Sequence, residues 1–243
     1  MSAIMSPTEV YEALRDSYHR YLETSFHLKD RSLLEQFRRL LRDKTQPPLV
    51  RQPILEVSPG FKVVSSLDQL IAEGILPDTF RKFEMDILKR PLYSHQDRAL
   101  RKAITGKRNL VVATGTGSGK TETFIYPIVN YLLRELESGT LKKPGVRALL
   151  LYPMNALAND QIARLRTIAK RFTEITFGRY TGETDQEHKD ALQSYRIFHN
   201  NEDPLHNELI CRDQMRDTPP HILFTNYAML EYLLIRPVDS RLF

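Results

Sequence analysis

Apolar residues in the first part of the chain recur at the three- and four-residue spacing of amphipathic helices. One predicted helix begins at Pro7 after a Ser6 cap, and a second begins near Asp30. Prolines then interrupt the pattern, so residues 46–66 are predicted to form an extended connector with a short strand at 54–57. The chain is therefore expected to open with a small helical region.

Further along, short apolar runs alternate with segments of helical periodicity. Runs of strand length occur at 109–112, 147–152, 175–180 and 221–225. Helices are predicted at 66–73, from about Ser94, at 122–137, at 155–171 and at 227–235, and the polar stretch 185–220 is predicted to be helix followed by loop. This alternation predicts an α/β domain with a mostly parallel sheet. The run at 147–152 is apolar on both faces, which predicts a strand covered by helices on each side.

A glycine-rich loop connects the first of these strands to the helix at 122–137, and the segment Val111–Glu122 reads VVATGTGSGKTE. Glycines allow backbone amides to surround phosphate oxygens, and the following helix directs its positive end at the same anion. Lys120 is predicted to reach the β- and γ-phosphates, and the Thr121 hydroxyl to hold Mg²⁺. The strict motif has glycine at the position of Thr114, yet the groups that touch phosphate are kept. The predicted nucleotide contacts are Thr114, Gly115, Thr116, Gly117, Ser118, Gly119, Lys120, Thr121 and Glu122, with Lys120 and Thr121 as the catalytic pair.

Polar residues also follow the three later strands. In a parallel sheet the turns after the strands meet at one edge, where ligands bind. Short hydroxyl and amide side chains beside helix N-termini suit contacts with a phosphate backbone, although each turn by itself is more typical of ordinary helix capping. Three such turns together predict a nucleic-acid path. The residues concerned are Pro153, Asn155, Thr181, Gly182, Thr225 and Asn226.

Composition limits the class of protein and its cellular compartment but does not identify its chemistry. The 243 residues are 41% hydrophobic and 27% charged, as in ordinary globular proteins. No apolar run approaches the roughly 20 residues of a membrane span, and the polar N-terminus is unlike a secretory signal. The single cysteine, Cys211, fits a cytoplasmic protein. A net charge of +5 favours polyanions only mildly.

The order of these motifs resembles that of superfamily 2 DEAD/DEAH-box helicases, and the sequences LYPMNALANDQ and TNYAMLEYLL look closest to the large bacterial Lhr-like helicases. The likeness covers about residues 91–235. It is carried by His95-Gln96, Ala113–Glu122, Tyr152–Gln161, Tyr180–Thr184 and Thr225–Glu231. The resemblance implies a RecA-like domain at 91–243, preceded by an accessory helical region and linker at 1–90.

The resemblance also implies roles for individual residues. Gln96 matches the glutamine that reads the adenine edge of ATP, and Tyr93 and Phe80 are both candidates for the aromatic that stacks on adenine. The implied partners are single-stranded or duplex nucleic acid, with DNA favoured over RNA by analogy, and a second helicase domain.

One expected motif does not occur in the sequence. Helicases of this family carry an Asp-Glu pair, in which the aspartate holds Mg²⁺ and the glutamate positions the hydrolytic water. The stretch 185–188 reads DQEH, but it lacks a preceding apolar strand and comes before Thr225-Asn226. The resemblance therefore implies an N-terminal helicase fragment, with an incomplete RecA-like sheet, that binds ATP and Mg²⁺ but hydrolyses little.

Two other classes of protein stay open. A different P-loop enzyme, such as a small kinase, would need an aspartate-bearing strand and an acceptor site within this chain. A non-catalytic nucleic-acid-binding or assembly module with a degenerate ATPase fold would bind nucleic acid without regard to ATP. Nucleotide-dependent affinity for nucleic acid separates the helicase portion from this last alternative.

Overall fold

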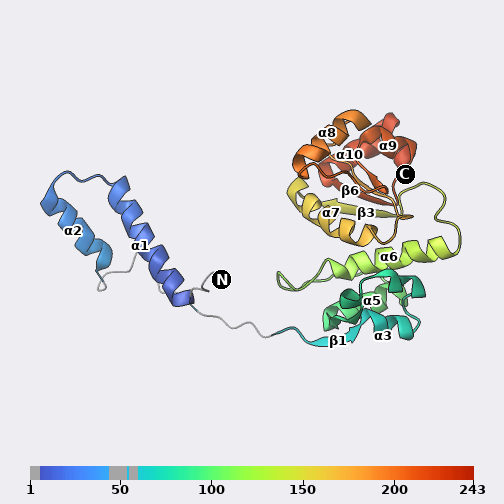
Figure 1. Ribbon diagram of the computed structural model, residues 1–243, viewed down its shortest axis with the longest axis horizontal. Coiled ribbons are helices and arrows are strands. Elements are labelled where there is room, and N and C mark those ends of the chain that lie inside the picture. The colour runs from blue at the N-terminus through green and yellow to red at the C-terminus, as the bar shows by residue number, and fades with distance from the viewer. Residues whose placement is uncertain (1–5, 44–53, 55–59) are drawn as a thin grey trace. The chain divides into compact units, whose positions relative to one another are not determined.

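The computed structural model describes residues 6–43, 54 and 60–243. The chain divides into two compact units, Met1–Gly60 and Phe61–Phe243. Figure 1 shows helices in the first unit and a mixture of helices and strands in the second. Among the described residues, both core clusters of buried side chains lie in the second unit.

The first unit contains a pair of helices, α1 (Pro7–Ser25) and α2 (Arg31–Arg42). Ser6 and Asp30 cap them through side-chain oxygens that accept backbone N–H groups, which confirms both predicted helix starts. Leu41 is buried, whereas Leu14 and Leu40 are exposed. The predicted strand at 54–57 lies largely outside the described residues.

The second unit begins with short helical elements packed around a two-stranded antiparallel pair. These elements are β1 (Val63–Ser66), α3 (Leu67–Ala72), η1 (Asp78–Lys82), α4 (Met85–Lys89), β2 (Pro91–Tyr93) and α5 (Ser94–Ile104). Ser66 forms the predicted cap of α3, and α5 begins at Ser94 as predicted. The antiparallel pair was not predicted, because each strand is too short to show a period.

Helix α6 (Glu122–Glu137) follows the glycine-rich loop, over the range that the sequence predicts. It packs along α5, and Figure 1 shows it between α5 and the part of the unit that holds the larger sheet. Its buried residues join those of α3, α5 and the sheet in one core cluster, so a continuous apolar interior fixes the loop before α6.

The larger sheet of the described residues has four parallel strands in the order β3-β6-β4-β5. The strands are β3 (Ala148–Tyr152), β4 (Phe177–Arg179), β5 (Glu208–Leu209) and β6 (Ile222–Asn226). The helices are α7 (Asn155–Ala169), α8 (His188–Phe198), α9 (Arg212–Asp217) and α10 (Tyr227–Ile235), followed by η2 (Pro237–Leu242). A parallel sheet with flanking helices confirms the predicted α/β class.

The side chains of β6 alternate between two core clusters. Ile222 and Phe224 belong to the cluster shared with α6 and α7, while Leu223 belongs to the cluster shared with α9, α10 and η2. β6 is one of the two inner strands of this sheet, and its burial on both faces explains its continuous apolar sequence.

Two strand predictions are wrong. Residues 109–112 form no strand, and Val111 is 97% exposed. Among the residues that the structure describes no strand pairs with this run, and an unpaired extended segment gains no ladder of hydrogen bonds. The second concerns β3, which is an edge strand rather than one covered on both sides. Leu149 and Leu151 are 38% and 48% exposed, so one face of β3 is open.

Two local predictions are also corrected. Asn155 does not cap α7, since Met154 is the residue before the first turn and the Asn155 side chain turns to another partner. The stretch 185–220 contains the short strand β5 and helix α9 in addition to the predicted helix. Strands of two residues leave no periodic signal in a sequence.

Candidate nucleotide and nucleic-acid sites

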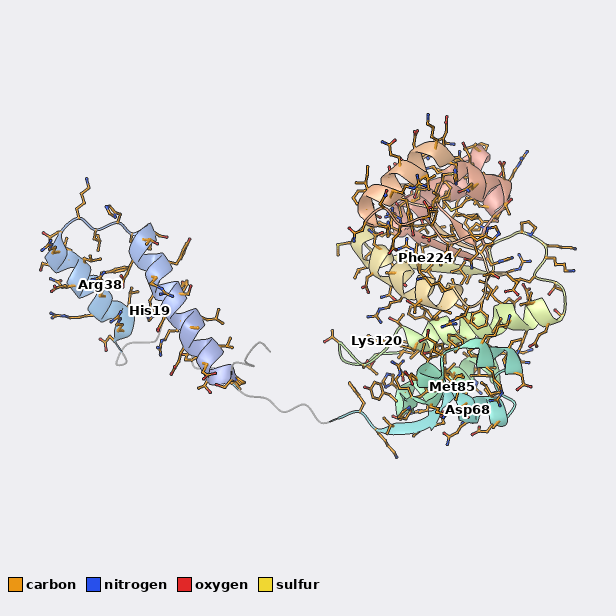
Figure 2. The ribbon with its side chains drawn as sticks, in the orientation of Figure 1. His19, Arg38, Asp68, Met85, Lys120 and Phe224 are labelled. Atoms are coloured by element: carbon orange, nitrogen blue, oxygen red, sulfur yellow. The ribbon has the colours of Figure 1, made fainter. Side chains whose placement is uncertain are left out.

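The glycine-rich loop is closed around the side chain of Lys120, which Figure 2 labels on the segment that leads into α6. The Lys120 ammonium donates to the carbonyl oxygens of Thr114 at 2.7 Å and Gly115 at 2.6 Å. Gly117 and Gly119 have φ angles of 74° and 71°, a backbone region that favours glycine. The sequence of the loop therefore encodes both its turns and its central charge.

Helix α5 holds this loop in place through the first residues of its N-terminal turn. The His95 ring contacts the Ser118 carbonyl oxygen through Nε2 at 2.8 Å, and the Gln96 amide donates to the Gly119 carbonyl oxygen at 2.9 Å. Gln96 also accepts a hydrogen bond from the Tyr93 N–H at 2.8 Å and is 5% exposed. The structure thus brings the predicted adenine reader to the phosphate loop, while adenine recognition itself stays a prediction.

The two aromatic candidates beside Gln96 have different surroundings. Phe80 is fully buried in the core against Phe83. Tyr93 is half-buried, stacks on His95 and contacts Phe61 at a centroid distance of 5.2 Å. Tyr93 is therefore the candidate with a ring surface near the loop, and Phe80 serves the core.

The side chains of the glycine-rich loop fit a nucleoside triphosphate with Mg²⁺. The Lys120 ammonium binds two neutral carbonyl oxygens that a phosphate group can replace. Glu122 Oε2 is buried without a hydrogen-bond partner among the described residues, which leaves an acceptor free for a water of the Mg²⁺ shell. The hydroxyls of Thr114 and Ser118 bond to each other at 2.7 Å, so Ser118 shapes the loop, while Thr116 is exposed at its tip.

At the carboxyl ends of the sheet strands, a chain of side-chain hydrogen bonds joins the three predicted nucleic-acid turns. The Asn226 amide donates to Asn155 Oδ1 at 2.8 Å, and the Asn155 amide donates to Glu183 Oε1 at 3.0 Å. Arg179 then donates to Glu183 Oε2 at 3.1 Å and to Asn159 Oδ1 at 2.6 Å. We call these five residues the edge network. It confirms that the turns after β3, β4 and β6 meet at one edge of the sheet.

The other predicted residues of these turns divide into two groups. Pro153 and Gly182 are exposed. Thr181 and Thr225 are fully buried: the Thr225 hydroxyl donates to the Tyr180 carbonyl oxygen at 2.7 Å, and the Thr181 hydroxyl accepts from Glu183 N–H at 3.4 Å. These hydroxyls shape the turns from inside, and their contact with a strand stays a prediction.

A buried ion pair supports the turn after β4 from behind. Asp239 is fully buried and accepts from the Tyr180 hydroxyl at 2.6 Å and from Arg216 Nε at 2.8 Å. Burial and this hydrogen bond to Asp239 raise the pKa of Tyr180 to about 12, so its hydroxyl stays protonated and donates at neutral pH. Arg212 adds bonds to the carbonyl oxygens of Thr181 and Gly182 at 3.1 and 3.2 Å.

A second ion pair fixes the helix that follows β3. Arg166 of α7 donates to Glu208 of β5 at 2.7 Å, and the Glu208 side chain is only 4% exposed. The Tyr195 hydroxyl donates to the same carboxylate at 3.2 Å. This pair ties α7, which begins at the edge network, to the far strand of the sheet.

Sequence reasoning missed the charged partners of the turns, namely Arg179, Arg212, Arg216 and Asp239. Arg179 lies just before the Thr181 turn, and its position at the end of a strand is the one signal that singles it out. The other three come from segments far along the chain, so their proximity to the turns depends on the fold.

A family model described as DEAD/DEAH box helicase matches residues 93–234, more than half of the chain, and the chain belongs to this family. Among curated proteins it is similar to Druantia protein DruE of Escherichia coli, with 28% identity over 97% of this chain and 17% of DruE. It is 32% identical to ATP-dependent helicase Lhr-Core of Methanothermobacter thermautotrophicus over 54% of this chain and 14% of that protein. The chain therefore spans less than a fifth of the length of either relative.

The fold is shared with the solved structure of the DEAD-box helicase Mss116 bound to ssRNA and UDP-BeF. That likeness has a TM-score of 0.50 and 21% identity, and it covers 72% of this chain and 31% of Mss116. The sheet is thus of the RecA-like helicase type. No helix in the described part of the chain is long and apolar enough to cross a membrane.

Proposed function

We propose that this chain is the ATP-binding, nucleic-acid-tracking portion of an ATP-dependent helicase or translocase. The observation that carries the proposal is the meeting of the three turns in the edge network, on the sheet of a chain that also carries a phosphate-binding loop. The relatives DruE and Lhr-Core are much longer than this chain, and Lhr-Core is named an ATP-dependent helicase.

In the proposed nucleotide site, Lys120 exchanges its two carbonyl partners for β- and γ-phosphate oxygens. The loop amides from Gly117 to Thr121 and the N-terminus of α6 bind the same anion. The Thr121 hydroxyl would hold the Mg²⁺ that accompanies ATP, and the Glu122 carboxylate would accept from a water bound there. Bound Mg²⁺ neutralises phosphate charge. Gln96 and Tyr93 receive the adenine.

In the proposed nucleic-acid site, the phosphate backbone of a strand lies along the edge network. Pro153 and Gly182 provide exposed backbone, and Asn155 and Asn226 provide amide donors near the first turns of α7 and α10. Contacts of this kind hold a strand without reading its sequence. We propose further that the domain at 91–243 performs this binding, with 1–90 as an accessory region and a second helicase domain as partner.

We propose that residues 1–243 alone turn over ATP negligibly, because the sequence offers no Asp-Glu pair to hold Mg²⁺ and orient the attacking water. Binding and hydrolysis are therefore expected to separate. A fluorescent ATP analogue should bind with Mg²⁺ present, while phosphate release stays at the level of buffer, with or without DNA.

Lys120→Ala tests the nucleotide site directly. A hydrogen bond to a charged group contributes about 1.5–3 kcal/mol, so the variant should bind the ATP analogue roughly 10- to 100-fold more weakly. Lys142→Ala, which removes an exposed lysine from the loop after α6, is the matched control and should bind normally. Steady DNA-stimulated turnover that Lys120→Ala abolishes would contradict the proposed inactivity, and unchanged binding in Lys120→Ala would contradict the nucleotide site.

A further inference from the structure

Glu183 places a negative charge at the centre of the edge network, where the proposed function puts a phosphate. Its Oε1 accepts from the Asn155 amide at 3.0 Å and its Oε2 from Arg179 at 3.1 Å. A guanidinium and an amide N–H are also the donors that proteins use for phosphodiester oxygens. The Glu183 carboxylate therefore occupies an anion position made by Arg179 and Asn155.

Two helix N-termini and the exposure of Arg179 also favour an anion at this position. Asn155 is the first residue of α7, and Asn226, which donates to Asn155, precedes the first residue of α10. Both helices direct their positive ends toward the edge. Arg179 is partly exposed, with 27% of its side-chain surface open, so a strand can reach it from solvent.

The turn itself does not depend on the Glu183 carboxylate. The Thr184 hydroxyl accepts from Thr181 N–H at 2.9 Å and donates to the Arg179 carbonyl oxygen at 2.8 Å, which closes the turn through the backbone. The Glu183 side chain is 58% exposed, and exposed ion pairs add little to stability. Its position is therefore better explained by competition for Arg179 than by support of the fold.

We propose that Arg179 is a phosphate-contacting residue for a nucleic-acid strand, and that Glu183 holds it in the free protein as an internal competitor. A strand phosphate displaces the Glu183 carboxylate from Arg179 and Asn155 and takes its place between them. This proposal rests on the proposed function, because it places one phosphate of the strand at the edge network. It adds that Glu183 lowers the affinity for the strand, because its carboxylate competes with the phosphate for Arg179.

The test is a double-mutant cycle on the full 243-residue chain, read as affinity for fluorescent oligo-dT and oligo-rU of about 20 nucleotides, long enough to cover a single-strand site. Glu183→Gln keeps the size of the side chain and removes its charge, so affinity should rise about threefold, the scale set by an exposed ion pair. Arg179→Gln should lower affinity by about the same factor and reduce the salt slope by roughly 0.7 for the lost phosphate contact. In the Arg179→Gln background, Glu183→Gln should then have a smaller effect, because only the competition for Asn155 remains.

Two controls separate this mechanism from a change in overall charge. Glu187→Gln removes an exposed glutamate four residues away, and Arg98→Gln an exposed arginine on α5; both should leave affinity nearly unchanged. Arg179→Lys keeps the positive charge and should retain most of the binding. Matching circular dichroism spectra and urea midpoints show that the variants are folded.

The outcomes distinguish the inference from the function on which it rests. If the unaltered chain binds neither oligonucleotide, the nucleic-acid part of the proposed function fails together with the inference. If the chain binds and Glu183→Gln changes nothing, or raises affinity equally with and without Arg179, the inference alone is overturned. An equal rise in Glu187→Gln also overturns it. A preference between the two oligonucleotides identifies whether the strand that displaces Glu183 is DNA or RNA.

Discussion

The glycine-rich loop and the edge network are both polar regions that follow apolar segments, but they are held in different ways. The loop is held through its own backbone carbonyl oxygens, by Lys120 from within the loop and by His95 and Gln96 from the adjoining helix α5. The edge network rests on strands paired in a sheet and is joined by side chains up to 71 positions apart. These contacts of the loop thus span at most 23 positions of the chain, whereas the edge is assembled from distant segments by the fold.

This difference predicts which substitutions damage each region. Changes in the loop should act through backbone conformation and short contacts, with effects that stay near the nucleotide. Changes behind the edge should act through buried charges and lower the stability of the whole unit.

The largest effect is expected for Asp239→Ala. This change removes the buried carboxylate partner of Arg216, whose side chain is only 14% exposed, and leaves it with the more exposed Asp213 at 3.5 Å. It also removes the acceptor of the Tyr180 hydroxyl. Loss of one partner of a buried pair costs about 3–5 kcal/mol, which urea denaturation measures directly. Asp217→Ala, at an exposed position, should cost less than ~0.5 kcal/mol. A small loss in Asp239→Ala would show that the edge does not depend on this pair.

A matched pair of glycine substitutions tests the loop. Gly117 and Gly119 have similar φ angles, 74° and 71°, so alanine at either position costs on the order of 1–2 kcal/mol in backbone strain. A side-chain carbon at Gly117 meets open space, whereas at Gly119 it collides with the Gln96 amide. Gly119→Ala should therefore be the more harmful to stability and to binding of the ATP analogue. Equal losses in both variants would mean that Gln96 does not hold the loop.

The smallest effect on stability is expected at Asn226, where two substitutions separate the capping of α10 from the hydrogen bond to the edge network. Its Oδ1 accepts from Met229 N–H at 2.7 Å and caps α10, while its amide donates to Asn155. Asn226→Ala loses both bonds and should cost about 1 kcal/mol in urea denaturation, the usual value for a cap. Asn226→Asp keeps the cap and loses only the donor, so most of that loss should disappear. An equal loss in both variants would assign the stability to the network.

How much the sequence could predict follows the same division. The starts of α1, α2 and α3 and the α/β class follow from caps and periodicity, which depend on neighbours within a few residues. The prediction of a strand at 109–112 was wrong, because a strand is stable only when another strand pairs with it. The prediction for the apolar run of β3 was wrong for a related reason: an apolar sequence shows what a strand can bury, whereas its coverage depends on the helices that pack against it.

The sequence by itself determined the glycine-rich loop with Lys120 and Thr121, and the three polar turns, since both depend on residue types at fixed short spacing. The tertiary structure alone decided that Glu183 stands between Arg179 and Asn155, and that Asp239 lies behind Tyr180. The physical reason is that a charge acts over a few ångströms of space, whatever the number of residues between its partners. Periodicity and motifs report neighbours along the chain, and only folding brings these charges together.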